Sequence, residues 1–369
     1  MRRSAYPSAF TNLISRSLRG FLFIVSLLGP GLNPALAEEI RGAGSTAAAR
    51  LYQVWGESFK TTGNQLKYDA IGSSSGLKAV IEGTVDFGAS DVALSPERAQ
   101  KDDLVCIPTA IAGIVPALNV AGLPQGRLRL TGPLLAAIYT GKVSKWNDEA
   151  IRKLNPGLNL PAEAIRVIAR EDGSGTTHVI SQYLTAVSPE WKQSMGNDFL
   201  LKWPASTLLA KGSGGVAKLI KQTPFSIGYL EAGTIQSEQI NYALVANKAG
   251  QYVQPNADSF SAALSGSRWS FEGRFEDSLN NNDDKKAWPI TTGTFVIMKR
   301  SVASPKRIAI VLNFLSGAFM QADKLVPASG YVALPLQTQA RAVKTLASLK
   351  ETNGVPIFFD VMWRPANKS

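Results

Sequence analysis

Cysteine and histidine are almost absent from this sequence of 369 residues, which contains one of each, Cys106 and His178. A single cysteine excludes an internal disulfide, and these two residues with scattered carboxylates form no cluster of metal-binding spacing. Cys106 lies in the apolar run 104–108, which predicts a buried strand residue rather than a nucleophile. We therefore expect no metal and no other cofactor.

Long apolar runs are also scarce. The run 21–28 follows four arginines and precedes Ala35-Leu36-Ala37, a pattern typical of a secretory signal peptide cleaved after residue 37. A membrane span takes about 20 residues, and no later stretch is longer and free of charge. The sequence thus predicts a soluble exported protein. Without a cysteine after the cleavage site to carry a lipid, we expect it in the periplasm.

Basic residues exceed acidic ones, but without a basic cluster. Removing the four arginines of the leader lowers the formal charge from +11 to +7, and no Lys/Arg run with interleaved aromatics follows. Nucleic-acid binding is therefore not indicated. The mature length of about 330 residues exceeds the usual limit for one compact core and predicts two domains.

Strand-like and helix-like segments alternate along the chain, at the spacing of a parallel α/β sheet. Asn147 is a candidate helix cap, and 280–286 reads as a polar loop. The predicted strands are 66–71, 85–89, 104–107, 114–119, 165–169, 225–230 and 294–298, and the predicted helices are 47–60, 77–82, 133–139, 148–154, 176–186, 215–222 and 305–320.

The segment 170–177 (REDGSGTT) places an arginine beside a small-residue turn that opens a helix. Such a turn offers hydroxyl and unpaired N–H donors at the positive end of the helix, and Arg170 can hold two oxygens at once. Similar turns occur at 42–46, 72–76 and 88–91, the first two leading into helices. In a parallel sheet such junctions gather at one edge. Four turns, with a single arginine among them, indicate one small anion site.

Two enzyme readings compete with an anion-binding site. Residues 72–76 (GSSSG) fit the G-x-S-x-G nucleophile elbow, but His178 falls in the first turn of the helix after Ser174, where a triad would occupy the space of the anion. Residues 42–47 fit a loose dinucleotide fingerprint with Asp69 downstream, yet little strand precedes them. The seven tryptophans are dispersed, which favours core packing over a carbohydrate platform.

Several motifs together resemble the phosphate-binding protein of the bacterial high-affinity phosphate ABC transporter. The resemblance covers nearly the whole mature chain and is carried by 42–46 (GAGST), 72–76 (GSSSG), 85–91 (VDFGASD), 138–142 (IYTGK), 145–151 (KWNDEAI), 154–157 (LNPG), 172–176 (DGSGT), 227–229 (IGY) and 288–291 (WPIT). It implies a two-lobed periplasmic binding protein of type II, an α/β fold in which each lobe is a mixed sheet flanked by helices. One lobe would hold residues 38–118 plus 290–369 and the other 119–289, with the ligand in the cleft between them.

The resemblance also implies the site. Phosphate-binding residues would be Thr46, Ala47, Ser73 and Asp91 from the first lobe and Arg170, Ser174, Gly175 and Thr176 from the second. Asp172 or Glu171 would orient the guanidinium. The sequence departs from the family pattern at Ala47-Ala48, where an aromatic residue and proline are common, and at Ser75, which replaces a common glycine.

The implied activity is binding without catalysis. A monomer would bind inorganic phosphate and deliver it to the permease subunits of an ABC transporter in the inner membrane. Asp91 would select phosphate, because a carboxylate accepts a hydrogen bond from a protonated phosphate oxygen but repels fully ionised sulfate. The simpler alternative for Asp91 is a capping role. The alternatives for the protein are an exported phosphatase or serine hydrolase using the 72–76 elbow, and a binding protein for another oxyanion.

Overall fold

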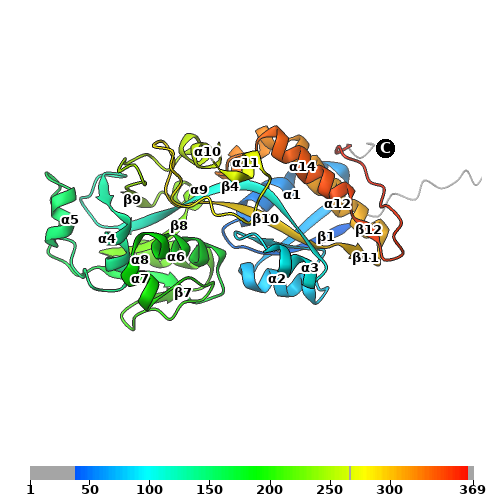
Figure 1. Ribbon diagram of the computed structural model, residues 1–369. Coiled ribbons are helices and arrows are strands. Elements are labelled where there is room, and N and C mark those ends of the chain that lie inside the picture. The colour runs from blue at the N-terminus through cyan, green and yellow to red at the C-terminus, as the bar shows by residue number, and fades with distance from the viewer. Residues whose placement is uncertain (1–37, 266, 365–369) are drawn as a thin grey trace, which may run out of the picture. The chain divides into compact units, whose positions relative to one another are not determined.

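The computed structural model describes residues 38–265 and 267–364, and the signal peptide expected at 1–37 lies outside them. Strands and helices alternate through most of this range, as the sequence predicts (Figure 1). The strands are β1 (Glu39–Gly44), β2 (Gln65–Ala70), β3 (Phe87–Ser90), β4 (Leu104–Asn119), β5 (Leu128–Leu130), β6 (Arg166–Arg170), β7 (Leu208–Ala210), β8 (Ser226–Glu231), β9 (Asn241–Val245), β10 (Thr291–Lys299), β11 (Ser301–Val302) and β12 (Lys350–Glu351).

The helices connect these strands and pack on them. In chain order they are α1 (Ala49–Phe59), the short 3-10 helix η1 (Lys60–Thr62), α2 (Ser73–Ile81), α3 (Pro96–Lys101), α4 (Gly132–Tyr139), α5 (Glu149–Leu154), α6 (Gly175–Val187), α7 (Pro189–Ser194), α8 (Gly212–Gln222), α9 (Ala232–Ser237), α10 (Ala257–Ser265), α11 (Arg268–Phe271), α12 (Pro305–Met320), α13 (Ala322–Leu325), the 3-10 helix η2 (Pro327–Ser329) and α14 (Leu336–Ala347).

One strand, β4, joins the sheet together. The strand order is β2-β1-β3-β10-β4-β8-β6-β7, with β9 also paired to β4 and β5 paired to β9. The first half of β4 runs antiparallel to β10, and its second half runs antiparallel to β8 (Figure 1). We call β2, β1, β3 and β10 the first strand group, and β8, β6 and β7 the second strand group. The parallel pairs within each group direct their carboxyl ends to one edge.

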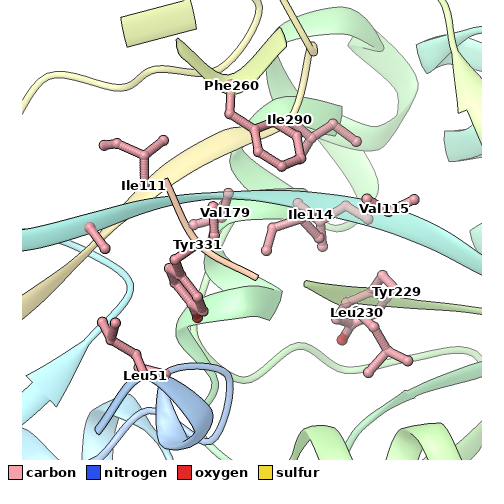
Figure 2. Close-up of a cluster of buried hydrophobic side chains, with 14 of the residues drawn as sticks. Leu51, Ile111, Ile114, Val115, Val179, Tyr229, Leu230, Phe260, Ile290 and Tyr331 are labelled. Atoms are coloured by element: carbon pink, nitrogen blue, oxygen red, sulfur yellow. The ribbon is translucent and has the colours of Figure 1, made fainter. Parts of the chain in front are cut away.

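Apolar side chains line both faces of β4 where it passes from one group to the other. Figure 2 shows Phe260 and Ile290 together on one side of this strand, and Tyr331 and Leu51 on the other. All four are buried, as are Ile111, Ile114 and Val115 of β4 itself. Because residues before β2, within β4 and after β10 meet here, the two strand groups share one continuous hydrophobic core.

Three expectations about the secondary structure are wrong. The segments 104–107 and 114–119 are one strand, because the buried residues between them continue the ladder to β10 with a single register shift at Thr294/Phe295. Helix α2 begins at Ser73 instead of 77, since the Gly/Ser turn is itself the first helical turn. Asp148, and not Asn147, caps α5, because its carboxylate accepts the N–H of Ala150 at 2.9 Å.

Other local expectations are confirmed. Helix α12 has the predicted bounds, and residues 280–286 form no helix or strand. Cys106 lies in a strand, β4, as predicted, but its side chain is half-buried instead of fully buried. Burial raises the pKa of the Cys106 thiol to about 12, which makes it a poor nucleophile. Among the described residues no single helix is long and apolar enough to cross a membrane, and α12 reaches that length only together with the segment to Ser329, across a bend of 73°.

Candidate anion-binding site

All four Gly/Ser turns lie at the carboxyl ends of strands, as the sequence predicts. Residues 42–46 end β1, residues 72–76 follow β2, residues 88–91 end β3 and residues 172–176 follow β6. The first three turns belong to the first strand group and the fourth to the second. The two groups run in opposite directions along β4, so polar loops from distant parts of the sequence lie at the carboxyl ends of both groups.

Asp91 is a buried carboxylate directly after β3, with 3% of its surface exposed. The Ser45 hydroxyl lies 2.7 Å from each of its carboxylate oxygens, and Thr292 donates to its backbone carbonyl at 2.8 Å. Burial raises the pKa of Asp91 from 3.8 to about 6, while the hydrogen bond from Ser45 and the charge of Arg170 partly oppose the rise. The carboxyl group thus titrates near neutrality, and Ser45, which the sequence reading did not assign to the site, holds it in place.

Arg170, the last residue of β6, carries the positive charge of the site and is only 3% exposed. Its Nε and Nη2 donate to the two carboxylate oxygens of Asp172 at 2.7 and 2.5 Å. Partial burial works to raise the pKa of Asp172, but the hydrogen bonds and charge of Arg170 outweigh it and lower the net pKa. Of the two acids expected to orient the guanidinium, the structure therefore selects Asp172. Nη1 is not engaged by Asp172 and can serve another acceptor.

Residues from the two strand groups touch directly at Ser73. The Ser73 hydroxyl oxygen accepts the N–H of Gly175 at 3.2 Å and the N–H of Asp91 at 3.4 Å. A Cβ at position 175 would lie 2.5 Å from the Ser73 oxygen and 3.0 Å from Asp91 Oδ2. Only glycine permits this approach, so the sequence requirement at 175 is steric.

Thr46 makes a second contact between the groups, with a residue that the sequence reading missed. Its hydroxyl oxygen accepts the N–H of Ser213 at 3.0 Å and lies 3.1 Å from the Ser213 hydroxyl. Ser213 belongs to a fifth Gly/Ser turn, residues 211–215 (KGSGG), which opens α8. This turn is rich in glycine and serine like the other four, so the sequence alone could have identified it. Ala47 beside Thr46 is buried, whereas Ser75 is exposed.

The start of α6 supplies hydrogen-bond donors. Ser174 caps this helix, and its oxygen accepts the N–H of Thr177 at 3.1 Å, which leaves its own proton free to donate. The Thr176 hydroxyl oxygen is buried and has no hydrogen-bond partner among the described residues. Helix N-termini bind anions through orphan N–H groups and the helix dipole. An anion placed here would satisfy donors that the protein itself leaves unused.

The hydrolase reading fails on geometry. No hydrogen bond joins Ser74 to His178 in the part of the chain that the structure describes, and the His178 ring instead packs on Phe199 with centroids 4.7 Å apart. Burial lowers the pKa of His178, with Asp198 opposing. Residues 38–265 and 267–364 also contain no group of three or more His, Cys, Asp or Glu able to hold a metal ion.

The predicted residues thus form one polar group with a distinct chemistry. The Ser73 side chain contacts both Asp91 and Gly175. The charge of Arg170 is close enough to lower the pKa of Asp91. Helix α6 begins beside them, with Ser174 as its cap and Thr176 in its first turn. One guanidinium and several N–H and O–H donors face a carboxyl group that can accept. This combination suits an oxyanion that carries a proton.

Comparison with known proteins agrees with this chemistry. A family profile described as a PBP superfamily domain matches residues 32–318. Phosphate-binding protein PstS of Xylella fastidiosa (strain 9a5c) is 39% identical over 317 residues, covering 84% of this chain and 87% of that protein. The chain belongs to the PstS family of phosphate-binding proteins. The PstS protein of Haemophilus influenzae is 38% identical over 319 residues, covering 86% of this chain and 94% of that protein.

Solved structures place the PstS-family chain in the same fold class. A phosphate-binding protein from Stenotrophomonas maltophilia aligns with a TM-score of 0.68 at 18% identity, covering 89% of this chain and 99% of that one. A putative phosphate ABC transporter substrate-binding protein from Clostridium perfringens, with bound phosphate, aligns with a TM-score of 0.59 at 19% identity, covering 81% and 100%. The predicted fold, an α/β binding protein of two lobes, is confirmed.

Proposed function

We propose that this protein binds inorganic phosphate and passes it to the permease of an ABC transporter. The names of its relatives support phosphate as the ligand. The observation that carries the proposal is the meeting of Asp91 and Arg170, from different strand groups, across the contact between Ser73 and Gly175. Such relatives bind and do not catalyse, so no enzymatic activity is proposed.

The proposed division of labour follows from the donors and acceptors. Thr46, Ala47 and Ser73 would contribute hydroxyl and backbone N–H donors from one side, and Ser174, Gly175 and Thr176 from the other. Arg170, fixed by Asp172, would hold phosphate oxygens through Nη1 and neutralise their charge. Asp91 would accept the proton that phosphate carries near neutral pH. Charge-assisted hydrogen bonds contribute about 1.5–3 kcal/mol each, so this set is sufficient for micromolar or tighter binding.

The proposal also includes the division of the chain into two lobes and the cellular location of the protein. Residues 38–118 with 290–369 would form one lobe and 119–289 the other, because the chain leaves the first strand group within β4 and returns to it at the start of β10. Ligand between the lobes would favour their closure. We further propose that the leader 1–37 directs export to the periplasm and that the protein acts there as a monomer.

Calorimetry with phosphate and sulfate tests the proposal. At pH 8 we expect phosphate to bind and sulfate not to bind, because Asp91 is ionised well above its pKa of about 6. Below pH 6 Asp91 carries a proton and can donate, so sulfate binding should appear there. Asp91→Asn, whose amide donates at every pH, should bind sulfate at pH 8, whereas the exposed Asp69→Asn should behave like the unmodified protein. Equal affinities for the two anions at pH 8 would refute the role of Asp91, and the absence of phosphate binding would refute the function.

A further inference from the structure

Glu231 is a second buried carboxyl group, at the carboxyl end of the second strand group. It is the last residue of β8 and pairs with Ile114, where β4 passes from one strand group to the other. Strands β8 and β6 are parallel neighbours, with Val167 opposite Ile227. Because the two strands end at the same level, Glu231 lies at the edge that also holds Arg170.

The Glu231 side chain is incompletely satisfied. Only 1% of the residue is exposed, and one carboxylate oxygen accepts a hydrogen bond from the Thr234 hydroxyl. The other oxygen, Oε2, has no hydrogen-bond partner among the described residues. A buried, ionised oxygen without a donor is costly, so this position favours a proton on Oε2.

Three ionisable groups act on Glu231 from the surrounding elements. Arg170 at the end of β6 favours its ionised form, whereas Asp91 after β3 and Tyr331 after η2 interact with it as like charges when ionised. The Ser213 hydroxyl at the start of α8 also lowers the pKa of Glu231, although the structure shows no hydrogen bond between the two side chains. Burial is the largest effect, and it raises the net pKa of Glu231.

The charge balance of the site follows from these neighbours. Asp172 already engages two donors of Arg170 and is ionised, so the single guanidinium is neutralised before any ligand arrives. Asp91 and Glu231 then remain as two carboxyl groups close to where an anion would bind. An ionised Glu231 would repel every anion, and the repulsion is strong because the groups are buried.

We propose that Glu231 couples phosphate binding to protonation: it takes up a proton from solvent onto Oε2 when phosphate binds, so that the site accepts its anion only together with that proton. This inference rests on the proposed function. Glu231 would act through the charge of the site, without itself touching the ligand.

The sign of the pH effect follows from linkage. A bound anion adds negative charge and shifts the pKa of Glu231 further upward, so protons are taken up in the pH interval between its values in the empty and loaded protein. Phosphate affinity should therefore fall as the pH rises through that interval. Gln at position 231 retains an acceptor for Thr234 and carries no charge, so it imitates the protonated acid at every pH.

The test is calorimetry of phosphate binding in buffers of different ionisation enthalpy, which counts the protons taken up. Glu231→Gln should take up fewer protons than the unmodified protein, and at pH 8.5 it should bind phosphate about tenfold more tightly, equivalent to one pKa unit of linked protonation. This advantage of Glu231→Gln should shrink as the pH falls, because Glu231 of the unmodified protein then becomes protonated before phosphate binds. The matched control is Glu238→Gln, an exposed acid that pairs with Lys221, and it should change neither quantity.

Two results would overturn the inference. One is an unchanged proton uptake in Glu231→Gln, and the other is an affinity change of the same size at pH 5.5 and 8.5, which would indicate a purely structural role. If Glu231→Gln does not fold, Thr234→Val serves instead. Its loss of a donor to the carboxylate should move the fall in affinity to higher pH, and an unmoved profile would contradict the inference. Failure of the unmodified protein to bind phosphate at any pH would instead refute the proposed function.

Discussion

Replacing Asp91 with asparagine should stabilise the phosphate-free protein at alkaline pH. The pKa of Asp91 is raised from 3.8 to about 6 in the folded state, chiefly by burial. A raised carboxyl pKa means that the folded state holds the proton more tightly than the unfolded state, so the free energy of unfolding falls as the pH rises from about 4 to above 6. At 1.36 kcal/mol per pKa unit, the shift corresponds to about 3 kcal/mol. Asparagine does not ionise, so its side chain causes no such fall in the free energy of unfolding as the pH rises.

Urea unfolding of protein freed of phosphate by refolding would measure the effect. The stability of Asp91→Asn relative to the unmodified protein should increase by about 2–3 kcal/mol between pH 4 and pH 8. Asp69→Asn, which replaces an exposed acid of β2, should show no such change with pH. A difference that stays constant from pH 4 to pH 8, or that decreases, would refute the conclusion that burial opposes the ionisation of Asp91.

Three further substitutions probe the site by phosphate affinity. Gly175→Ala should weaken binding about 5- to 100-fold, because the new methyl group would clash with Ser73 and such overpacking costs about 1–3 kcal/mol. The control Gly214→Ala, with nothing within 4 Å of the added atom, should bind normally. Arg170→Lys should weaken binding about 10- to 100-fold, since lysine loses the forked pairing with its carboxylate partner and the charge-assisted hydrogen bonds of about 1.5–3 kcal/mol each. Thr176→Val should weaken binding about fivefold, the value of one hydrogen bond, without destabilising the phosphate-free protein, because the lost hydroxyl has no partner there.

Each of these substitutions has a result that contradicts its premise. Gly175→Ala with an affinity within twofold of Gly214→Ala would show that the two strand groups do not approach here in the loaded protein. An unchanged affinity in Arg170→Lys would remove the bidentate requirement. Thermal unfolding of phosphate-free Thr176→Val at a markedly lower temperature would show that its hydroxyl has a structural role.

Local sequence signals predicted the polar turns and the acid that pairs with Arg170. Glycine-rich turns before helices, and the pairing of Arg170 with an acid two residues later, depend on residues adjacent in the chain. Their geometry can therefore be inferred from sequence alone. The family motifs then placed Asp91 opposite Arg170, and in the structure the two are close enough for the charge of Arg170 to lower the pKa of Asp91.

Features that depend on tertiary contacts were not predictable. The strand β4 looked like two strands because Pro108 and Gly113 interrupt its apolar pattern, yet pairing with β10 carries the ladder through both. Ser45 and Glu231 acquire their roles only from the neighbours that folding brings to them. Glu231 follows an ordinary apolar strand, and nothing in its local sequence indicates that its carboxyl group is buried beside an arginine.

The position of β10 in the sheet also dictates the order in which the chain can fold. Strand β3 pairs with β1 and β10, and β4 pairs with β10 instead of β3. The first strand group therefore has an unpaired edge until residues 291–299 arrive, about 200 residues after β3 in the sequence. Such long-range pairing slows folding and exposes a strand edge to aggregation. Thr292 of that late strand donates to the Asp91 carbonyl, so the surroundings of Asp91 are complete only after this long-range pairing has formed.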